Sequence, residues 1–370
     1  MQRATGGIGV RVAVKDLIAV EGFLRSLGNA GVLDRAVPQA SDAACLSGLR
    51  QAEKSGEARF VGTTQLHELG LGATGINPWF GVPINPVDAA LIPGGSSSGA
   101  AVVVASDLAD IGIGTDTGGS IRIPAACCGV YGLKTSVGRI PLDGVHAVSP
   151  TLDTVGPLAR DVDSLIRGMQ LLEPGFTAAP TADGVRVGRV QLTADPRIDA
   201  AVDAVLSGAE LPWDVVSLDG WERAESANRV VVCVEAMRVN RELREGGSGI
   251  RWGSDTDTVF REGMNCTVEA WDQALATTEW WKSQIDAAFL QCDVLAMPTL
   301  RTEVPTLDHA EDIYRSRATS PINLAGLPAV AIPIPWSGYG PASLQLVGKP
   351  MSEPLLLAVA KLVERSLHSH

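Results

Sequence analysis

Two segments rich in serine and glycine lie close together in IPGGSSSGAAVVVASDLADIGIGTDTGGSIRIPAA, residues 92–126. The first serine loop, GGSSSG, covers residues 94–99, and the second serine loop, TDTGGS, covers residues 115–120. Between them come a helix-like run of small apolar residues and the strand-like stretch DIGIG. A helix followed by a strand can return the chain to its starting point. The pattern therefore predicts that hydroxyl groups and glycine backbone from the two loops meet.

Strand-like and helix-like patterns alternate along most of the chain. Strands are predicted for Val10–Val14, ending at Lys15, and for residues 58–62, 110–114, 185–187, 215–218, 293–298, 329–335 and 342–348. Helices are predicted for residues 41–50, 162–172, 198–206 and 355–363. This alternation indicates an α/β fold with a parallel or mixed sheet covered by helices on both faces. No repeat or flexible linker interrupts it, so we expect one domain over residues 1–370, with the polar stretch 220–270 as a mobile or variable excursion.

Composition excludes several classes of function. The 370 residues are 45% hydrophobic and 19% charged, and the formal net charge is −12, which disfavours nucleic acid and anionic membranes as partners. The N-terminus lacks the apolar core of a signal peptide, and no window approaches the roughly 18 apolar residues of a membrane span. The six cysteines show no metal-binding spacing. We therefore expect a cytoplasmic protein with reduced thiols and a small-molecule partner.

Three interpretations compete for the two serine loops. A phosphate cradle is disfavoured because neither loop matches GxxxxGK[ST] and no GxGxxG follows the first strand. Tight turns with helix-capping serines explain single positions, but they do not explain why both loops combine serine and glycine. The third interpretation is a nucleophile beside an oxyanion hole: Ser120 attacks, and the backbone around Gly118 and Gly119 holds the resulting negative oxygen.

A serine nucleophile needs a base. None of the five histidines lies in a Ser/His/Asp context or a GxSxG elbow. Lys15 directly follows the apolar segment VRVAV, and burial there would lower its pKa and supply a neutral amine. The alternative is a strand-end lysine whose amine reaches water.

These motifs resemble the amidase signature family, whose catalytic unit is a Ser–cis-Ser–Lys triad. VAVKDLI resembles the lysine strand of the family, GGSSSGAA its first serine motif, and GIGTDTGGSIRIPAACCGVYGLKTSVGRIP its central signature. TLDTVGPLARD, NLAGLPAVAIPIP and ASLQLVG resemble later segments, and the likeness is strongest over residues 57–163. The resemblance implies a single-domain fold with a large twisted mixed sheet and helices on both faces.

The resemblance also assigns roles. It implies Lys15 as the base, Ser96 as the cis-serine that relays protons, and Ser120 as the nucleophile. The oxyanion hole is expected from the backbone N–H groups of Thr117, Gly118, Gly119 and Ser120. Supporting roles around the triad are expected for Ser97, Ser98, Asp116 and Arg122.

The implied activity is hydrolysis of the C–N bond of a small or medium carboxamide through an acyl-enzyme, with no metal or organic cofactor. Two alternatives stay open. One is a glutaminase-type A subunit of a tRNA-dependent amidotransferase, and the other is a biosynthetic acyl-transfer or low-activity relative. A homodimer is a fair expectation for the oligomeric state.

The family usually carries a helical segment before the catalytic lysine, whereas Lys15 lies 15 residues from the start. Part of a wall of the substrate pocket, or a contact between subunits of an oligomer, is therefore expected to be absent. Candidate walls of the substrate pocket are Trp79 and Phe80, the stretch 220–270 and residues 302–314, although core packing is the alternative role for each aromatic side chain.

Overall fold

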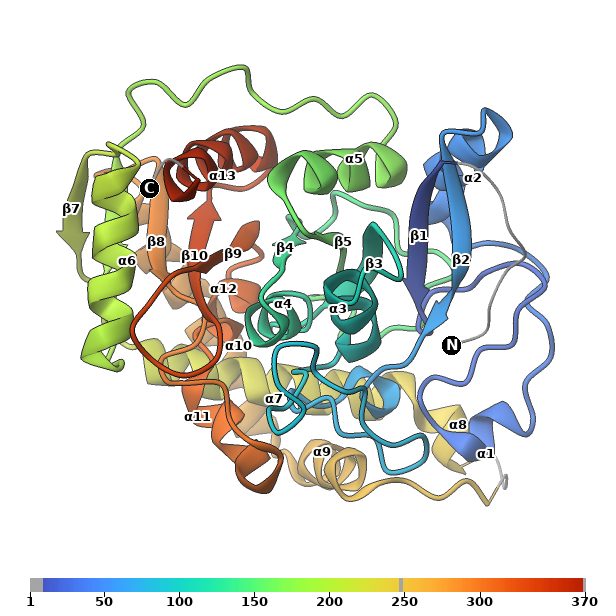
Figure 1. The fold of residues 1–370 in the computed structure, drawn as a ribbon. Helices are drawn as coiled ribbons and strands as arrows, with labels where there is room; N and C mark the ends of the chain where they lie inside the picture. Colours follow the sequence, from blue (N-terminus) through green and yellow to red (C-terminus); the bar gives the residue numbers. More distant parts are fainter. Residues whose placement is uncertain (1–8, 246–248, 369–370) are drawn as a thin grey trace.

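The structure of the protein is a computed structural model that describes residues 9–245 and 249–368. Within these residues, ten strands form one mixed sheet in the order β2-β1-β3-β5-β4-β9-β10-β8-β6-β7 (Figure 1). The strands are β1 (Val10–Lys15), β2 (Ala58–Thr64), β3 (Ile111–Asp116), β4 (Tyr131–Lys134), β5 (Thr154–Ala159), β6 (Val187–Val190), β7 (Trp213–Val216), β8 (Val294–Pro298), β9 (Ala329–Ile334) and β10 (Ala342–Gly348). The predicted α/β class with a mixed sheet is confirmed.

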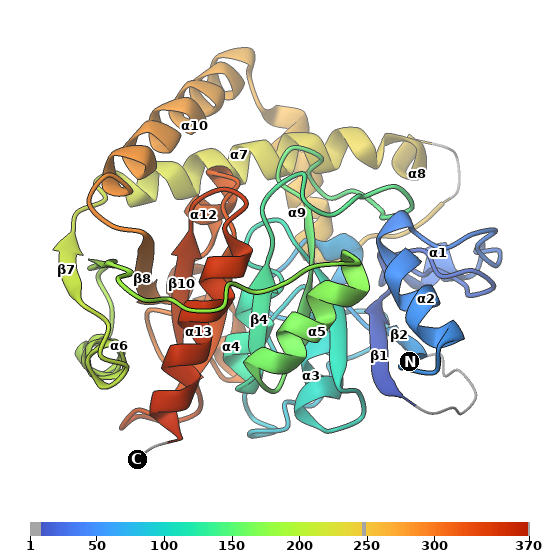
Figure 2. The same cartoon turned by 90° about the horizontal axis from the view of Figure 1, so that it is seen from above.

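Helices cover both faces of the sheet (Figure 2). The first face is covered by α2 (Ser47–Lys54), α5 (Val162–Leu172), α6 (Pro196–Gly208) and α13 (Glu353–Leu367). The second face is covered by α3 (Ser98–Ala105), α4 (Arg122–Cys128), α7 (Trp221–Val239), α10 (Val268–Ala288) and α12 (Ser320–Leu324). Side chains alternate along each strand. On β1, Val12 and Val14 therefore join the core of the first face, while Ala13 packs with Val103 on the second.

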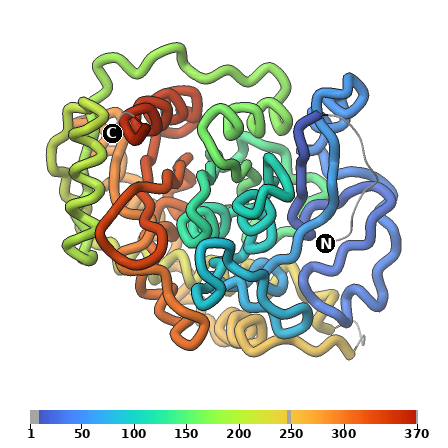
Figure 3. Tube along the Cα trace, viewed as in Figure 1, coloured from blue at the N-terminus to red at the C-terminus, as the bar shows by residue number. Residues whose placement is uncertain are grey.

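Four further helices lie outside these two layers or at their edges: α1 (Ala30–Leu33), α8 (Arg241–Glu245), α9 (Ser254–Asn265) and α11 (Ile313–Ser316). Short 3-10 helices occupy Ala44–Leu46, Glu68–Gly70 and Leu307–Asp312. The chain trace in Figure 3 shows β1 and β2 at one end of the molecule and α6 and β7 at the other end.

The predicted elements are found with shifted ends. The strand over 342–348 and the helix over 162–172 have the predicted bounds, whereas the helix expected over 41–50 begins as a 3-10 turn at Ala44 and runs to Lys54. Sequence patterns missed α7 and α10. Their buried positions recur every three or four residues but hold alanine and polar residues as well as large apolar ones, which weakens the apolar pattern. The stretch 220–270, expected to be a polar excursion, forms all of α7, α8 and α9 and the start of α10, and its residues 246–248 lie outside the described residues.

Parallel pairing brings the ends of two central strands together. β1 pairs with β3 in parallel, with Val12 beside Ile111 and Val14 beside Ile113. Both strands therefore end at the same edge of the sheet, β1 at Lys15 and β3 at Asp116. Helix α3 packs closely on β3, where a Cβ at Gly112 would approach the Ala100 carbonyl oxygen to 2.9 Å. The small residues between the two serine loops thus allow the close packing that positions both.

All six cysteines are free thiols, five of them buried and Cys266 partly exposed. In the part of the chain that the structure describes, every helix is too short or too polar to cross a lipid bilayer.

Candidate active site

Lys15 ends β1 with its side chain completely buried. Its Nζ lies 2.7 Å from the Oγ of Ser96 and 2.7 Å from the Oγ1 of Thr115. Burial lowers the pKa of the Lys15 amine to about 7, although the negative charges of Asp116 and Asp153 oppose that change. A large fraction of this amine is therefore neutral near pH 7 and able to accept a proton.

The first serine loop lies directly against the end of β3. The Gly95–Ser96 peptide bond is cis. Ser97 is buried; its N–H donates to the backbone oxygen of Ser120 over 3.1 Å and its hydroxyl to that of Thr115 over 3.2 Å. These bonds hold the two serine loops side by side. The buried hydroxyl of Ser98, at the start of α3, has no hydrogen-bond partner in the described residues.

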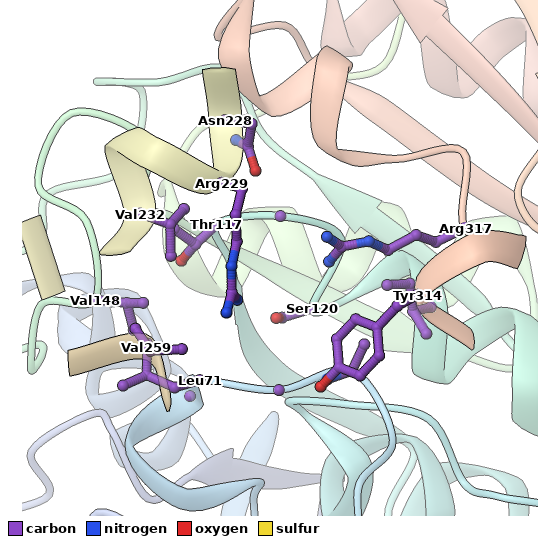
Figure 4. A pocket seen from close by; sticks show the side chains of 15 residues that line it. Leu71, Thr117, Ser120, Val148, Asn228, Arg229, Val232, Val259, Tyr314 and Arg317 are labelled. Carbon is purple, nitrogen blue, oxygen red and sulfur yellow. The ribbon is translucent and has the colours of Figure 1, made fainter. Parts of the chain in front are cut away.

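Ser120 ends the second serine loop and lines a cavity. Figure 4 shows its side chain among those of Arg229, Tyr314 and Leu71. The residue is 8% exposed, so a small ligand can reach it although most of its surface is covered. Within residues 9–245 and 249–368 its hydroxyl makes no hydrogen bond. The structure therefore shows the Lys15–Ser96 hydrogen bond but no hydrogen bond between Ser96 and Ser120.

The backbone of the second serine loop departs from expectation at one position. The N–H of Gly119 donates to the Asp116 carboxylate over 2.8 Å, so it is not available as an oxyanion-hole donor. The N–H groups of Thr117, Gly118 and Ser120 make no hydrogen bond to any described residue. The physical reason is that the buried carboxylate needs donors, and the N–H of Gly119 lies within its reach.

A buried ion pair supports the loop. The Asp116 carboxylate accepts bonds from the backbone of Ile121 and from the side chains of Arg122 and Asn323. Asp116 and Arg122 are both fully buried, with 3.0 Å between their charged atoms. Burial alone would raise the pKa of Asp116, but Arg122, together with the charge of Lys134 and a hydrogen bond from Asn323, outweighs burial and holds that pKa below its usual range. The pair holds the loop in place through charge-assisted hydrogen bonds.

Asp153 reaches the second serine loop from the segment before β5. Its Oδ1 accepts the Thr117 hydroxyl over 2.5 Å, and its carboxylate also accepts the N–H groups of Val148 and Ser149. Burial raises the pKa of Asp153 to about 6, against these hydrogen bonds. Asp153 thus anchors the side chain of Thr117 from outside the loop.

The cavity at Ser120 has a volume of about 50 Å³ and adjoins an outer cavity of about 380 Å³. Helices α7, α9 and α11 contribute Arg229, Val259 and Tyr314 to the lining of the cavity at Ser120 (Figure 4). Five residues line both cavities: Leu71, Arg229, Val259, Tyr314 and Arg317. A substrate can therefore place a small group at Ser120 while a larger group occupies the outer cavity.

The predicted pocket walls are found in part. The stretch 220–270 supplies Asn228, Arg229, Val232 and Val259, and the segment 302–314 supplies Tyr314. Trp79 and Phe80 do not line the cavity: the Trp79 indole donates to Glu68, and Phe80 is 40% exposed. Sequence analysis missed Arg317, Thr115 and Asp153. Thr115 could have been found from the sequence, because it lies on β3, which pairs with the strand that carries Lys15. No sequence signal pointed to Arg317.

In the described residues, no group of three or more His, Cys, Asp or Glu side chains is arranged to hold a metal ion.

The fold and site define an α/β enzyme with a buried lysine, a cis-serine and a second serine at one sheet edge. The family model named Amidase matches residues 7–198 and 256–357. The A subunit of a glutamyl-tRNA(Gln) amidotransferase from Natronomonas pharaonis is 32% identical, over 94% of this chain and 93% of that protein. A fatty acid amide hydrolase from Medicago truncatula is 29% identical, over 96% of this chain and 64% of that protein.

A solved structure described as an amidase superposes with a TM-score of 0.84, at 29% identity over 97% of this chain and 85% of that one. The chain therefore belongs to the amidase family, whose members act on the carbon–nitrogen bond of amides.

Proposed function

We propose that this protein hydrolyses a small carboxamide through an acyl-enzyme on Ser120, with Ser96 as proton relay and Lys15 as base. The supporting observation is the 2.7 Å contact between the buried Lys15 amine, whose pKa is about 7, and the Ser96 hydroxyl. A base with a pKa near the working pH combines a useful neutral fraction with a useful affinity for the proton.

In the first half-reaction, Ser120 Oγ attacks the amide carbon and its proton passes through the Ser96 hydroxyl to Lys15 Nζ. The N–H groups of Thr117, Gly118 and Ser120 are the donors proposed for the oxyanion. The lysine proton then returns through Ser96 to the leaving nitrogen, and the C–N bond breaks. Water attacks the acyl-enzyme by the same proton route and releases the acid, which restores all three side chains.

The test is release of ammonia or amine from a panel of aliphatic and aromatic amides. Wild-type protein should turn over at least one class, and Ser120→Ala should lose activity by several orders of magnitude. A fluorophosphonate probe should label Ser120 and leave the Ser120→Ala variant unlabelled, as read by mass spectrometry. Undiminished turnover in Ser120→Ala would refute the mechanism.

A second candidate is the glutaminase component of an amidotransferase, favoured by the 32% identity with the Natronomonas pharaonis protein over nearly the whole chain. It predicts that ammonia release from glutamine is low for the isolated chain and rises when partner subunits are added. Full activity of the isolated chain on a simple amide would contradict it. A cytoplasmic location and a homodimer stay predictions.

A further inference from the structure

Two arginine side chains reach the cavity at Ser120. Arg229 from α7 and Arg317, directly after α11, both line it, and its described lining includes no Asp or Glu. Figure 4 shows both guanidinium groups extending toward the space beside Ser120. Two like charges that share a poorly hydrated space repel each other. A bound anion would relieve that repulsion.

Of the two arginines, Arg317 has the fewer charged and polar partners. In the part of the chain that the structure describes, its guanidinium makes no ion pair and no hydrogen bond; it lies over the ring of Tyr314, with 5.5 Å from Cζ to the centroid. Burial lowers the pKa of this guanidinium, against the attraction of Tyr314 and Glu225. Arg229 is different, because its Nε is paired with Glu262 over 2.7 Å.

Asn228 adds a third polar group at the same place. The residue is 2% exposed, and its Nδ2 has no hydrogen-bond partner among the described residues. A Cβ built on Gly118 would lie 3.7 Å from Asn228 Oδ1 and 3.8 Å from Arg317 Nη1. Rotation of the amide by half a turn exchanges its oxygen and nitrogen and turns the unpartnered donor toward this position. Donors from Asn228 and Arg317 can therefore converge beside Gly118, two residues before the proposed nucleophile.

We propose that the substrate carries a carboxylate on its acyl group, a few bonds from the scissile carbonyl, and that Arg317, with Arg229 and Asn228, binds this carboxylate. The inference rests on the proposed amide hydrolysis and names its substrate class. A guanidinium matches a carboxylate through two parallel N–H···O bonds, and a buried donor without a partner gains most from such a ligand.

The size of the cavity limits the acyl chain. Its volume of about 50 Å³ is several times the 10–15 Å³ that one water needs, so it holds roughly three to five waters or a short carbon chain. Among the described residues, carboxylates line the outer cavity (Asp255 and Glu311) but not the cavity at Ser120, so an ammonium group on the acyl chain would find no partner beside Ser120. The substrate class is thus the monoamide of a short, unsubstituted dicarboxylic acid, and its hydrolysis consumes one water and yields the dicarboxylate and ammonium.

The first experiment compares succinamate with 4-oxopentanamide, in which a methyl ketone replaces the carboxylate. In wild-type protein, kcat/KM for succinamate should exceed that for the neutral amide by on the order of tenfold to a hundredfold, the usual effect of a hydrogen bond to a charged group. L-glutamine is a third substrate, and it should be hydrolysed more slowly than succinamate. An equal or reversed preference in either comparison overturns the substrate class proposed here.

The second experiment assigns the preference to a residue. Arg317→Gln should bring the ratio of kcat/KM for succinamate to kcat/KM for 4-oxopentanamide closer to one. Arg229→Gln should reduce this ratio less. Arg315→Gln is the matched control, because Arg315 lies two residues away with a side chain 90% exposed, and its ratio should match wild type. An unchanged ratio in a folded Arg317→Gln protein, as judged by its melting temperature, overturns the assignment of Arg317.

A binding measurement separates this inference from the proposed function. Calorimetry with Ser120→Ala protein should detect succinate binding that is at least about tenfold weaker in Ser120→Ala/Arg317→Gln. If wild-type protein hydrolyses neutral amides but Ser120→Ala does not bind succinate, the inference fails and the proposed function stands. If no amide is hydrolysed but succinate binds through Arg317, the function fails and the anion site stands.

Discussion

The Nζ of Lys15 and the Oγ of Ser96 lie 2.7 Å apart, although 81 positions of sequence separate the two residues. The contact forms where the buried end of β1 meets the first serine loop. It joins an amine whose pKa burial lowers to about 7 to a hydroxyl that can carry its proton.

The pH dependence of activity should report the Lys15 amine. Because the neutral amine is the base, kcat/KM should be low near pH 5.5, reach half its maximum at about 7 and stay level above that. The sign follows from the lowered pKa: raising the pH removes the proton that blocks the base. The check is a pH profile in the free-enzyme regime, and a profile that falls between pH 6 and 8 would contradict the role of Lys15.

Thr115 should influence the pH at which kcat/KM reaches half its maximum. Its Oγ1 accepts a bond from Lys15 Nζ, which favours the charged amine, so Thr115→Val should move the inflection of the pH profile about one unit lower. Thr64→Val is the control. Thr64 pairs with Lys15 in the register of β1 and β2, but its buried hydroxyl has no partner among the described residues. The profile of Thr64→Val should match wild type, and equal shifts in both variants would argue for a general change in packing.

The two glycines of the second serine loop should respond differently to alanine. Gly119 has a φ of +127°, and a Cβ there would come within 2.2 Å of Thr319 Oγ1, so Gly119→Ala should destabilise folding by at least about 2 kcal/mol. At Gly118 the nearest atom is 3.7 Å from the added Cβ. Gly118→Ala should therefore keep its stability and lose activity by narrowing the cavity. Urea unfolding and amide turnover distinguish the two, and similar unfolding midpoints would contradict this account.

The Asp116–Arg122 pair should be needed for stability. Arg122→Met leaves a buried carboxylate without its cation and should cost about 3–5 kcal/mol of unfolding free energy at pH 7. Because the pair holds the pKa of Asp116 below its usual value, its stabilisation is complete above about pH 4 and is lost as the pH falls through the lower native pKa. Wild type and Arg122→Met should therefore converge in stability in acid. Parallel stability curves from pH 7 to pH 2 would show that the pair does not act this way.

Much of the site could be predicted from local sequence. The two serine loops, the buried lysine at the end of a strand and the small residues between the loops all have local signals, because turns and buried strands restrict composition. The alternation of strand and helix patterns predicted the mixed sheet. In contrast, α7 carries Asn228 and Arg229 on a helix whose buried stripe includes polar residues such as Asn228 and Glu235, so the apolar pattern that would have revealed the helix is weak.

By itself, the sequence determined which backbone could bend sharply, which strands could be buried and where hydroxyls and an amine were available, since these depend on residue type and close neighbours. Only the tertiary structure decided that Lys15 meets Ser96 and Thr115, that the Gly119 N–H turns to Asp116, and that Arg317 reaches the cavity without an ion pair to any described residue. The physical reason is that pKa values, hydrogen-bond partners and charge balance depend on distance and burial among residues far apart in the chain.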